Sequence, residues 1–132
     1  AAAGAAGYFV VYARTYPSAS APAFQFGMKE LYDYLESPAT QGHDSIYITR
    51  NEDLPWVHLL FYRRFPPAEY QRHGLSRTRY LFDQEVFYKG ERIPGRRNPV
   101  FVWKPWEVPS SGVAPRRVVR YPDGSEAFVV AW

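Results

Sequence analysis

The three histidines are the residues of this 132-residue chain best suited to acid–base chemistry. His43 is followed directly by Asp44 ahead of a predicted strand, whereas His58 falls inside a predicted helix and His73 in a basic stretch. A hydrolase needs a nucleophile with a base beside it, or two carboxylates that face one bond. Adjacent side chains rarely point at one target, and the chain has no Gly-x-Ser-x-Gly motif. We therefore expect His43 to be a solvent-facing loop residue and His58 to be packed.

Metal and cofactor chemistry lacks its usual motifs in this sequence. Cysteine is absent, which removes thiolate catalysis, disulfides and cysteine-based zinc sites. No His-x-x-x-His pair or calcium loop occurs, and the glycines are scattered rather than gathered in a phosphate-binding loop. Asp33 and Glu36 share a face of a predicted helix, as many solvated carboxylates do. The sequence therefore predicts no catalytic residue, no metal and no cofactor in this domain.

Basic residues outnumber acidic ones in residues 63–97, whereas acidic residues prevail in 1–53. Guanidinium groups form strong bidentate hydrogen bonds with phosphates. Four residues are therefore candidates for contact with a phosphate or a lipid headgroup: Arg63, Arg64, Arg72 and His73. The alternative is a solvated arginine-rich face whose charges pair with nearby carboxylates.

Aromatic and basic residues are interleaved between residues 61 and 80, for example in Phe61–Phe65 and Arg77–Tyr80. Such a stretch could stack bases and neutralise phosphates. Nearly every tyrosine, however, lies in a segment with a core-facing period, and no RNP-like consensus is present. A nucleic-acid-binding α/β module is therefore the second interpretation, and nucleic acid is the less favoured partner.

Length and composition fit one small domain. Apolar residues make up 46% of the chain and aromatic residues 18%, which is enough for a packed core without metals or disulfides. We expect a lead-in over residues 1–20 and a single α/β domain over residues 21–132.

Helical periodicity dominates the first half of that domain. One apolar face is formed by Phe24, Met28, Leu31 and Leu35. Ser20 is a candidate N-cap for this helix, which is predicted to end before Pro38. A second helix is predicted from about residue 54 to 65, with a further helical turn over 67–72.

Strand periodicity dominates the second half. The predicted strands are residues 45–49, 80–82, 86–88 and 98–103. Residues 117–121 and 127–132 flank the turn Pro122-Asp123-Gly124-Ser125, which predicts a C-terminal β-hairpin. One strand–helix–strand crossover should join 45–49 to a later strand. The expected fold class is α/β: a small mixed β-sheet packed by two main helices, with a C-terminal hairpin.

The lead-in begins with alanine and glycine and continues as Tyr8-Phe9-Val10-Val11-Tyr12. Aromatic residues gather at membrane–water interfaces, so the segment is typical of the exit from a spanning helix. It is equally compatible with a cloning remnant followed by a buried helical turn. We expect it to close at Pro17.

Four segments carry a family resemblance: Tyr8–Pro17, Phe24–Glu30, Asp44–Thr49, and Pro55–Tyr62 with Pro67–Gln71. Together they resemble the C-terminal extracytoplasmic domain of multi-spanning, polyprenyl-phosphate-sugar-dependent glycosyltransferases. These enzymes belong to the protein mannosyltransferase and aminoarabinose transferase superfamily. The aromatic helix followed by Pro-x-x-Tyr-Gln is the most specific of the four.

The resemblance implies a parent enzyme that moves a sugar from a polyprenyl phosphate to an acceptor on the extracytoplasmic face, periplasmic or extracellular, of the cell membrane. In that superfamily the catalytic carboxylate lies in a segment that these residues do not match, so no catalytic residue carries over. The domain would cover the membrane-embedded cavity. Its implied partners are the transmembrane part of the same polypeptide, the polyprenyl-phosphate sugar and the membrane surface.

Overall fold

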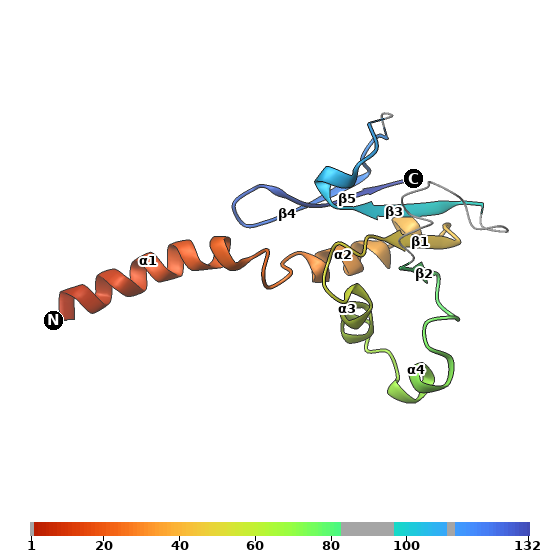
Figure 1. Ribbon diagram of the computed structural model, residues 1–132, viewed down its shortest axis with the longest axis horizontal. Coiled ribbons are helices and arrows are strands. Elements are labelled where there is room, and N and C mark those ends of the chain that lie inside the picture. The colour runs from red at the N-terminus through yellow and green to blue at the C-terminus, as the bar shows by residue number, and fades with distance from the viewer. Residues whose placement is uncertain (1, 83–96, 111–112) are drawn as a thin grey trace.

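The computed structural model of the chain describes residues 2–82, 97–110 and 113–132 (Figure 1). These residues form four α-helices and a five-stranded mixed sheet, so the predicted α/β fold is confirmed. The strand predicted at 86–88 lies outside the described residues.

The sheet has a parallel half and an antiparallel half. Its strands are β1 (Ser45–Ile48), β2 (Tyr80–Leu81), β3 (Pro99–Trp103), β4 (Arg117–Arg120) and β5 (Glu126–Ala131), in the spatial order β2-β1-β3-β5-β4. β1 is parallel to both β2 and β3, whereas β5 is antiparallel to both β3 and β4. Two helices lie between β1 and β2 in the chain, which confirms the predicted strand–helix–strand crossover.

The turn between β4 and β5 is formed as its residue types predict. The Asp123 carboxylate accepts hydrogen bonds from the backbone N–H of Ser125 at 2.9 Å and from its hydroxyl at 2.6 Å. Gly124 supplies a positive φ of 88°. The backbone N–H of Tyr121 closes the hairpin on the Ser125 carbonyl at 2.8 Å.

One face of the sheet is covered by α2 (Met28–Leu35), which confirms the helix predicted there. Four of its side chains are at most 1% exposed: Met28, Leu31, Tyr32 and Leu35. They form one buried cluster with residues of three strands: Ile46, Ile48, Val100, Val102, Phe128 and Val130. Each such side chain contributes about 1.5–3 kcal/mol by leaving water, so this contact holds the domain together.

The opposite face of the sheet is covered by the connection between β3 and β4. Val108 and Val113 pack there against a buried cluster that includes Tyr47 and Trp103. The Phe101 ring stacks on both of these rings, at centroid distances of 5.1 and 5.2 Å. The short 3₁₀-helix η2 (Pro105–Glu107) begins this connection. This connection is therefore a cover for the core.

The helix predicted over residues 54–65 and the further helical turn predicted over 67–72 are both present, as two short helices. α3 (Pro55–Tyr62) ends earlier than expected, and α4 (Pro67–His73) follows Pro66. The chain leaves helical geometry at Arg64, whose φ is 49°. α4 packs loosely, with no buried residue.

The predicted start of the helix near Ser20 is wrong. α2 begins at Met28, and the turn 21–27 separates it from α1 (Ala2–Ser20). The positive φ values of Gln25 (52°) and Gly27 (93°) interrupt the helix. The Ser20 hydroxyl bonds back to a carbonyl of α1 and caps nothing beyond it, and Phe24 is 72% exposed.

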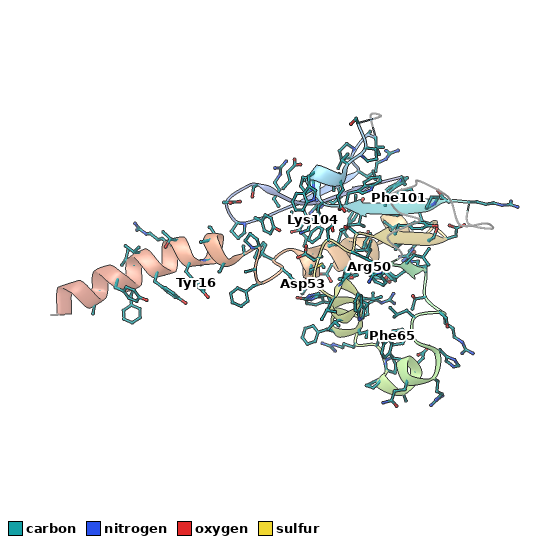
Figure 2. The ribbon with its side chains drawn as sticks, viewed as in Figure 1. Tyr16, Arg50, Asp53, Phe65, Phe101 and Lys104 are labelled. Atoms are coloured by element: carbon teal, nitrogen blue, oxygen red, sulfur yellow. The ribbon has the colours of Figure 1, made fainter. Side chains whose placement is uncertain are left out.

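α1 extends beyond Pro17, where the lead-in was expected to close, and projects away from the α/β body (Figure 1). Figure 2 shows Tyr16 on this helix, clear of the part that carries Phe101 and Lys104. Tyr8, Tyr12 and Tyr16 stack along one side, with ring centroids 6.1 and 4.6 Å apart. Among residues 2–82, 97–110 and 113–132, no helix has both the length and the apolar character needed to span a membrane.

Replacing Gly27 by alanine tests how α2 meets the hairpin. A Cβ atom there would lie 2.8 Å from Cγ1 of Val119, at a φ of 93° that side chains rarely adopt. We expect Gly27→Ala to lower the free energy of unfolding by about 2–4 kcal/mol, from strain and overpacking together. Urea denaturation followed by tryptophan fluorescence measures this loss.

The matched control is Gly124→Ala. Gly124 has a similar φ of 88°, and no described atom lies within 4 Å of the added Cβ. We expect it to lose only about 1–2 kcal/mol. Equal losses at the two positions would contradict a specific contact between Gly27 and Val119.

Candidate anion-binding site

The candidate phosphate-contact residues lie on α3, on α4 and between them. Arg63 is the C-cap of α3 and Arg64 follows it, whereas Arg72 and His73 occupy the last turn of α4. The structure brings only the first of these to a hollow of about 360 Å³. Three arginines line that hollow, together with apolar Leu59 and Phe65: Arg63, Arg77 and Arg79.

Glu36 lies at the centre of this arginine cluster. Its Oε1 is 2.6 Å from Nη1 of Arg63 and 3.7 Å from Nη2 of Arg79. The hydroxyl of Tyr80 donates a hydrogen bond to the same oxygen. Glu36 is therefore a counter-ion for two arginines, and not merely a solvated carboxylate that shares a helix face with Asp33.

Arg79 has a structural role at the end of α2. Its guanidinium donates hydrogen bonds to the backbone carbonyls of Leu35 and Thr40, the latter at 2.6 Å. The last carbonyls of a helix have no intrahelical donor and carry partial negative charge. Arg79 bonds such a carbonyl at the end of α2 (Leu35) and at the end of the short 3₁₀-helix Pro38–Thr40, so an incoming ligand would find this side chain already engaged.

Arg63 and Arg77 are the arginines best placed to meet an anion. The Arg63 side chain is 41% exposed and its partner Glu36 is 32% exposed, and ion pairs this exposed contribute only about 0–1 kcal/mol. Arg63 can exchange Glu36 for a phosphate at little cost. Within the described part of the chain, Arg77 takes part in no ion pair. Two guanidiniums beside an apolar floor fit a phosphate joined to an apolar group.

The other three candidates lie outside this hollow. Arg64 and Arg72 are exposed and His73 is half-buried. None of the three lines the hollow. Their contact with a phosphate or headgroup stays a prediction.

The nucleic-acid interpretation also stays a prediction. The structure gives it less support than the interleaved aromatic and basic residues of the sequence do. Tyr80 is only 3% exposed, so its ring is not offered to a base. Arg63 and Arg79 are paired with Glu36. Phe61, which is 74% exposed, is the clearest stacking surface in this stretch.

His43 and Asp44 lie at the amino end of β1. Nδ1 of His43 is 3.1 Å from the carbonyl of Asn98, and its ring is 4.7 Å from that of Trp132. The Asp44 carboxylate accepts hydrogen bonds from the backbone N–H of Arg97 (2.6 Å) and of Asn98. These contacts align the start of β3 beside β1. Ligands of open α/β sheets bind at the carboxyl end instead.

His58 is half-buried on α3 and stacks on Tyr62, with ring centroids 6.2 Å apart. Burial lowers the pKa of its imidazole from the usual value. The residue is packed, as its helical position predicted.

A buried ion pair at the carboxyl end of β1 and β3 was not foreseen. Lys104 and Glu52 are 3% and 7% exposed and pair with each other. The Lys104 ammonium also lies 4.3 Å from the Phe128 ring centroid and 3.4 Å from the Tyr121 hydroxyl. Since both charges are buried and paired, the pair fixes the loops at this edge.

Comparison with protein families, with curated proteins and with solved structures finds no match to this chain. Among the described residues, no group of three or more histidine, aspartate or glutamate side chains could hold a metal ion.

The hydroxyl of Tyr80 gives the cluster a measurable pH dependence. Burial raises the pKa of Tyr80 well above its usual value, and the hydrogen bond to Glu36 and the charge of that carboxylate add to the rise. Burial likewise raises the pKa of Tyr32. The folded chain thus holds these protons more tightly than the unfolded chain. The stability that these two raised pKa values contribute is fully present below about pH 10 and is lost as the pH rises above it.

Above pH 10, the free energy of unfolding should fall less steeply with pH in Tyr80→Phe than in the parent chain. We expect the two slopes to differ by up to about 1.4 kcal/mol per pH unit. Denaturant titrations between pH 8 and pH 11.5, about one unit or more on each side of the ordinary tyrosine pKa, measure the slope. Tyr70→Phe, at an exposed position of α4, is the comparison variant. The assignment fails if Tyr80→Phe leaves the slope of the parent chain unchanged.

Proposed function

We propose that this chain is a non-catalytic, extracytoplasmic domain of a membrane glycosyltransferase that transfers a sugar from a polyprenyl-phosphate donor. The resemblance of residues 8–71 to such domains supports the enzyme class. The observation that carries the membrane location is α1, a projecting helix whose side chains stay exposed and mostly apolar.

The surface of α1 is unusual for a helix in water. Tyr8, Phe9 and Val11 are 65%, 66% and 60% exposed, and Arg14 is the only charged residue of the helix. A contiguous apolar surface of this kind marks a site of contact with a membrane or another protein. Tyrosine and phenylalanine suit the headgroup level, where a ring can be apolar on one side and wet on the other. We assign this surface to the outer membrane–water interface, beside the transmembrane part of the same polypeptide.

This placement gives the α/β body a physical role. With α1 at the membrane surface, the body lies over the membrane-embedded reaction site, where it excludes water and shapes the entry of the acceptor. Arg63 and Arg77 would contact the donor phosphate or a lipid headgroup. The reacting carboxylate belongs to another part of the polypeptide, so the domain contributes binding and covering but no bond-making group.

The membrane contact is tested with vesicles. We expect the chain to cosediment with vesicles of phosphatidylcholine and phosphatidylglycerol, and the triple variant Tyr8→Ser, Phe9→Ser, Val11→Ser to bind at least about tenfold more weakly. The three side chains lie outside the buried core, so the circular dichroism of the body should be retained. Phe61→Ser is the control, because Phe61 is 74% exposed on α3, away from α1. Equal binding by the parent and the triple variant contradicts the membrane contact.

The glycosyltransferase assignment is tested in membranes that contain the intact gene product. We expect its coding frame to encode several apolar spans on the N-terminal side of Ala1, and the membranes to transfer labelled sugar from a polyprenyl-phosphate donor. Arg63→Ala combined with Arg77→Ala should raise the KM for the donor about tenfold and leave kcat nearly unchanged, because the lost contact is a binding contact.

Arg50→Ala is the matched control, since this exposed arginine does not line the hollow and is not among the candidates for phosphate contact. An unchanged donor KM in the double variant rejects the phosphate contact. An initiation codon directly before Ala1 rejects the whole assignment.

A further inference from the structure

A second concavity lies at the base of α1, where the chain turns into α2. This α2 groove has a volume of about 460 Å³ and is formed by residues 24–27, by Lys29, Glu30 and Asp33 of α2, and by Tyr62 of α3. Its size falls within the range of small-ligand sites. It shares no lining residue with the arginine-lined hollow.

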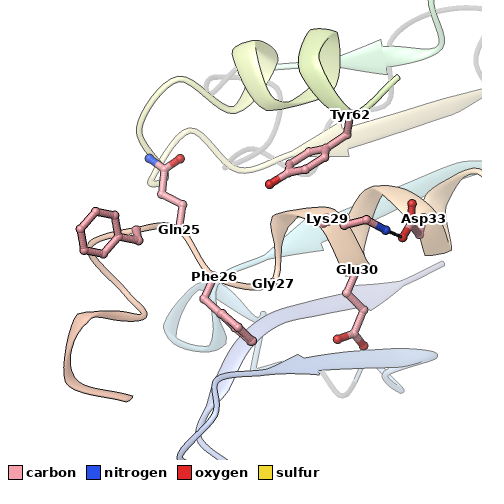
Figure 3. Close-up of a pocket in the computed structure, with 8 residues that line it drawn as sticks. Gln25, Phe26, Gly27, Lys29, Glu30, Asp33 and Tyr62 are labelled. Atoms are coloured by element: carbon pink, nitrogen blue, oxygen red, sulfur yellow. Dashed lines mark hydrogen bonds and ion pairs between the residues drawn. The ribbon is translucent and has the colours of Figure 1, made fainter. Parts of the chain in front are cut away.

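Figure 3 shows how the side chains of the groove are arranged. The Tyr62 ring reaches from α3 toward the turn that carries Gln25, while Lys29 and Asp33 pair along α2. Phe26 and Glu30 point to the other side of α2, toward the strands of the hairpin. Two aromatic side chains therefore flank the first turn of α2.

The walls of the groove are held in place before any ligand arrives. Gln25 Nε2 donates a hydrogen bond to the backbone carbonyl of Asp53 at 2.9 Å, which ties the turn to the residue two positions before α3. Gly27 lies against Val119 of β4. A site fixed in this way loses little conformational entropy when it binds.

The polar groups of the groove are in pairs that can open. Lys29 Nζ and Asp33 Oδ2 are 2.5 Å apart, but their side chains are 70% and 62% exposed. Glu30 pairs with Arg117 at 2.6 Å, and both side chains are about half exposed. Exposed pairs contribute little free energy, so a ligand can take over these hydrogen bonds at small cost.

We propose that the α2 groove binds a short neutral carbohydrate. A hydroxyl both donates and accepts hydrogen bonds, and the groove offers an ammonium donor, two carboxylate acceptors and an amide that does both. Phe26 and Tyr62 are 47% and 36% exposed, so part of each ring can contact the apolar C–H side of a pyranose. Phe26 and Tyr62 lie on opposite sides of the first turn of α2 (Figure 3), so we expect a chain of several sugar units to contact both better than a single sugar does.

Other ligand classes fit this chemistry less well. A cationic peptide would be repelled by the Lys29 ammonium, and an anion would be repelled by the carboxylates of Glu30 and Asp33. A purely apolar ligand would remove water from these charges and would offer no hydrogen bonds in place of those that the water made. A neutral polyhydroxylated chain satisfies all of them and still covers the aromatic faces.

This inference deepens the proposed function and rests on it for the role of the sugar: the groove would hold the carbohydrate part of a substrate at the membrane side of the body. The binding itself is independent of the membrane. A failure to bind sugar leaves the vesicle and transfer results unaffected, so the two ideas fail separately.

The test is saturation-transfer NMR and calorimetry on the intact chain in membrane-free buffer, with maltotriose, cellotriose and mannotriose as probes. We expect at least one trisaccharide to bind with a millimolar Kd, and Phe26→Ala or Tyr62→Ala to weaken that binding about tenfold. Lys29→Ala combined with Asp33→Ala removes only exposed side chains, so it tests the site without threatening the fold. It should weaken binding by a smaller factor.

Trp106→Ala is the matched control, because Trp106 is an aromatic residue that is 74% exposed and lies outside the groove. It should leave the Kd unchanged. Absence of binding by all three probes overturns the proposal. Equal weakening by Trp106→Ala and Tyr62→Ala overturns it as well, since binding would then be a general property of exposed rings.

Discussion

The rest of the structure depends on the close approach of Gly27 to Val119, because it determines where α2 begins and how it lies on the sheet. A side chain at Gly27 would collide with the hairpin, so the first turn of α2 sits directly over β4. From that point four buried side chains of the helix reach the parallel strands. The same contact fixes one wall of the α2 groove. Core and groove therefore share one anchor.

Ion pairs between charged side chains connect the helices and loops outside this contact. Glu36 joins α2, the end of α3 and the start of β2 through Arg63 and Arg79, whereas Glu52 and Lys104 join the loops after β1 and β3. The first cluster is partly exposed and can exchange partners. The second is buried, and removing one of its two charges would leave the other uncompensated in the core. This difference explains why the exchangeable cluster is the better candidate for ligand contact.

Local patterns predicted the elements well, and long-range pairings poorly. The β-branched and aromatic runs of β1 and β3, the turn at Asp123 and Gly124, and the periodicity of α2 each depend on a few neighbouring residues, so residue types suffice to predict them. The start of α2 was misplaced because the left-handed conformation of Gln25 is not encoded by its residue type. The basic stretch was recognised from composition, but only tertiary contacts decide that Arg77 lines the hollow and Arg64 does not. No spacing in the chain indicates that Glu52 pairs with Lys104.

Among the strands that the structure describes, the two outer ones have a consequence for self-association. β2 is only two residues long, and β4 carries Arg117 and Arg120 at its ends, each engaged by a carboxylate of its own chain. Short margins and charged margins are the features that discourage one sheet from adding to another. A domain crowded beside its copies on a two-dimensional surface meets them far more often than it would in free solution. The edge strands of this sheet therefore favour brief contacts between copies and disfavour the pairing of strands from two copies.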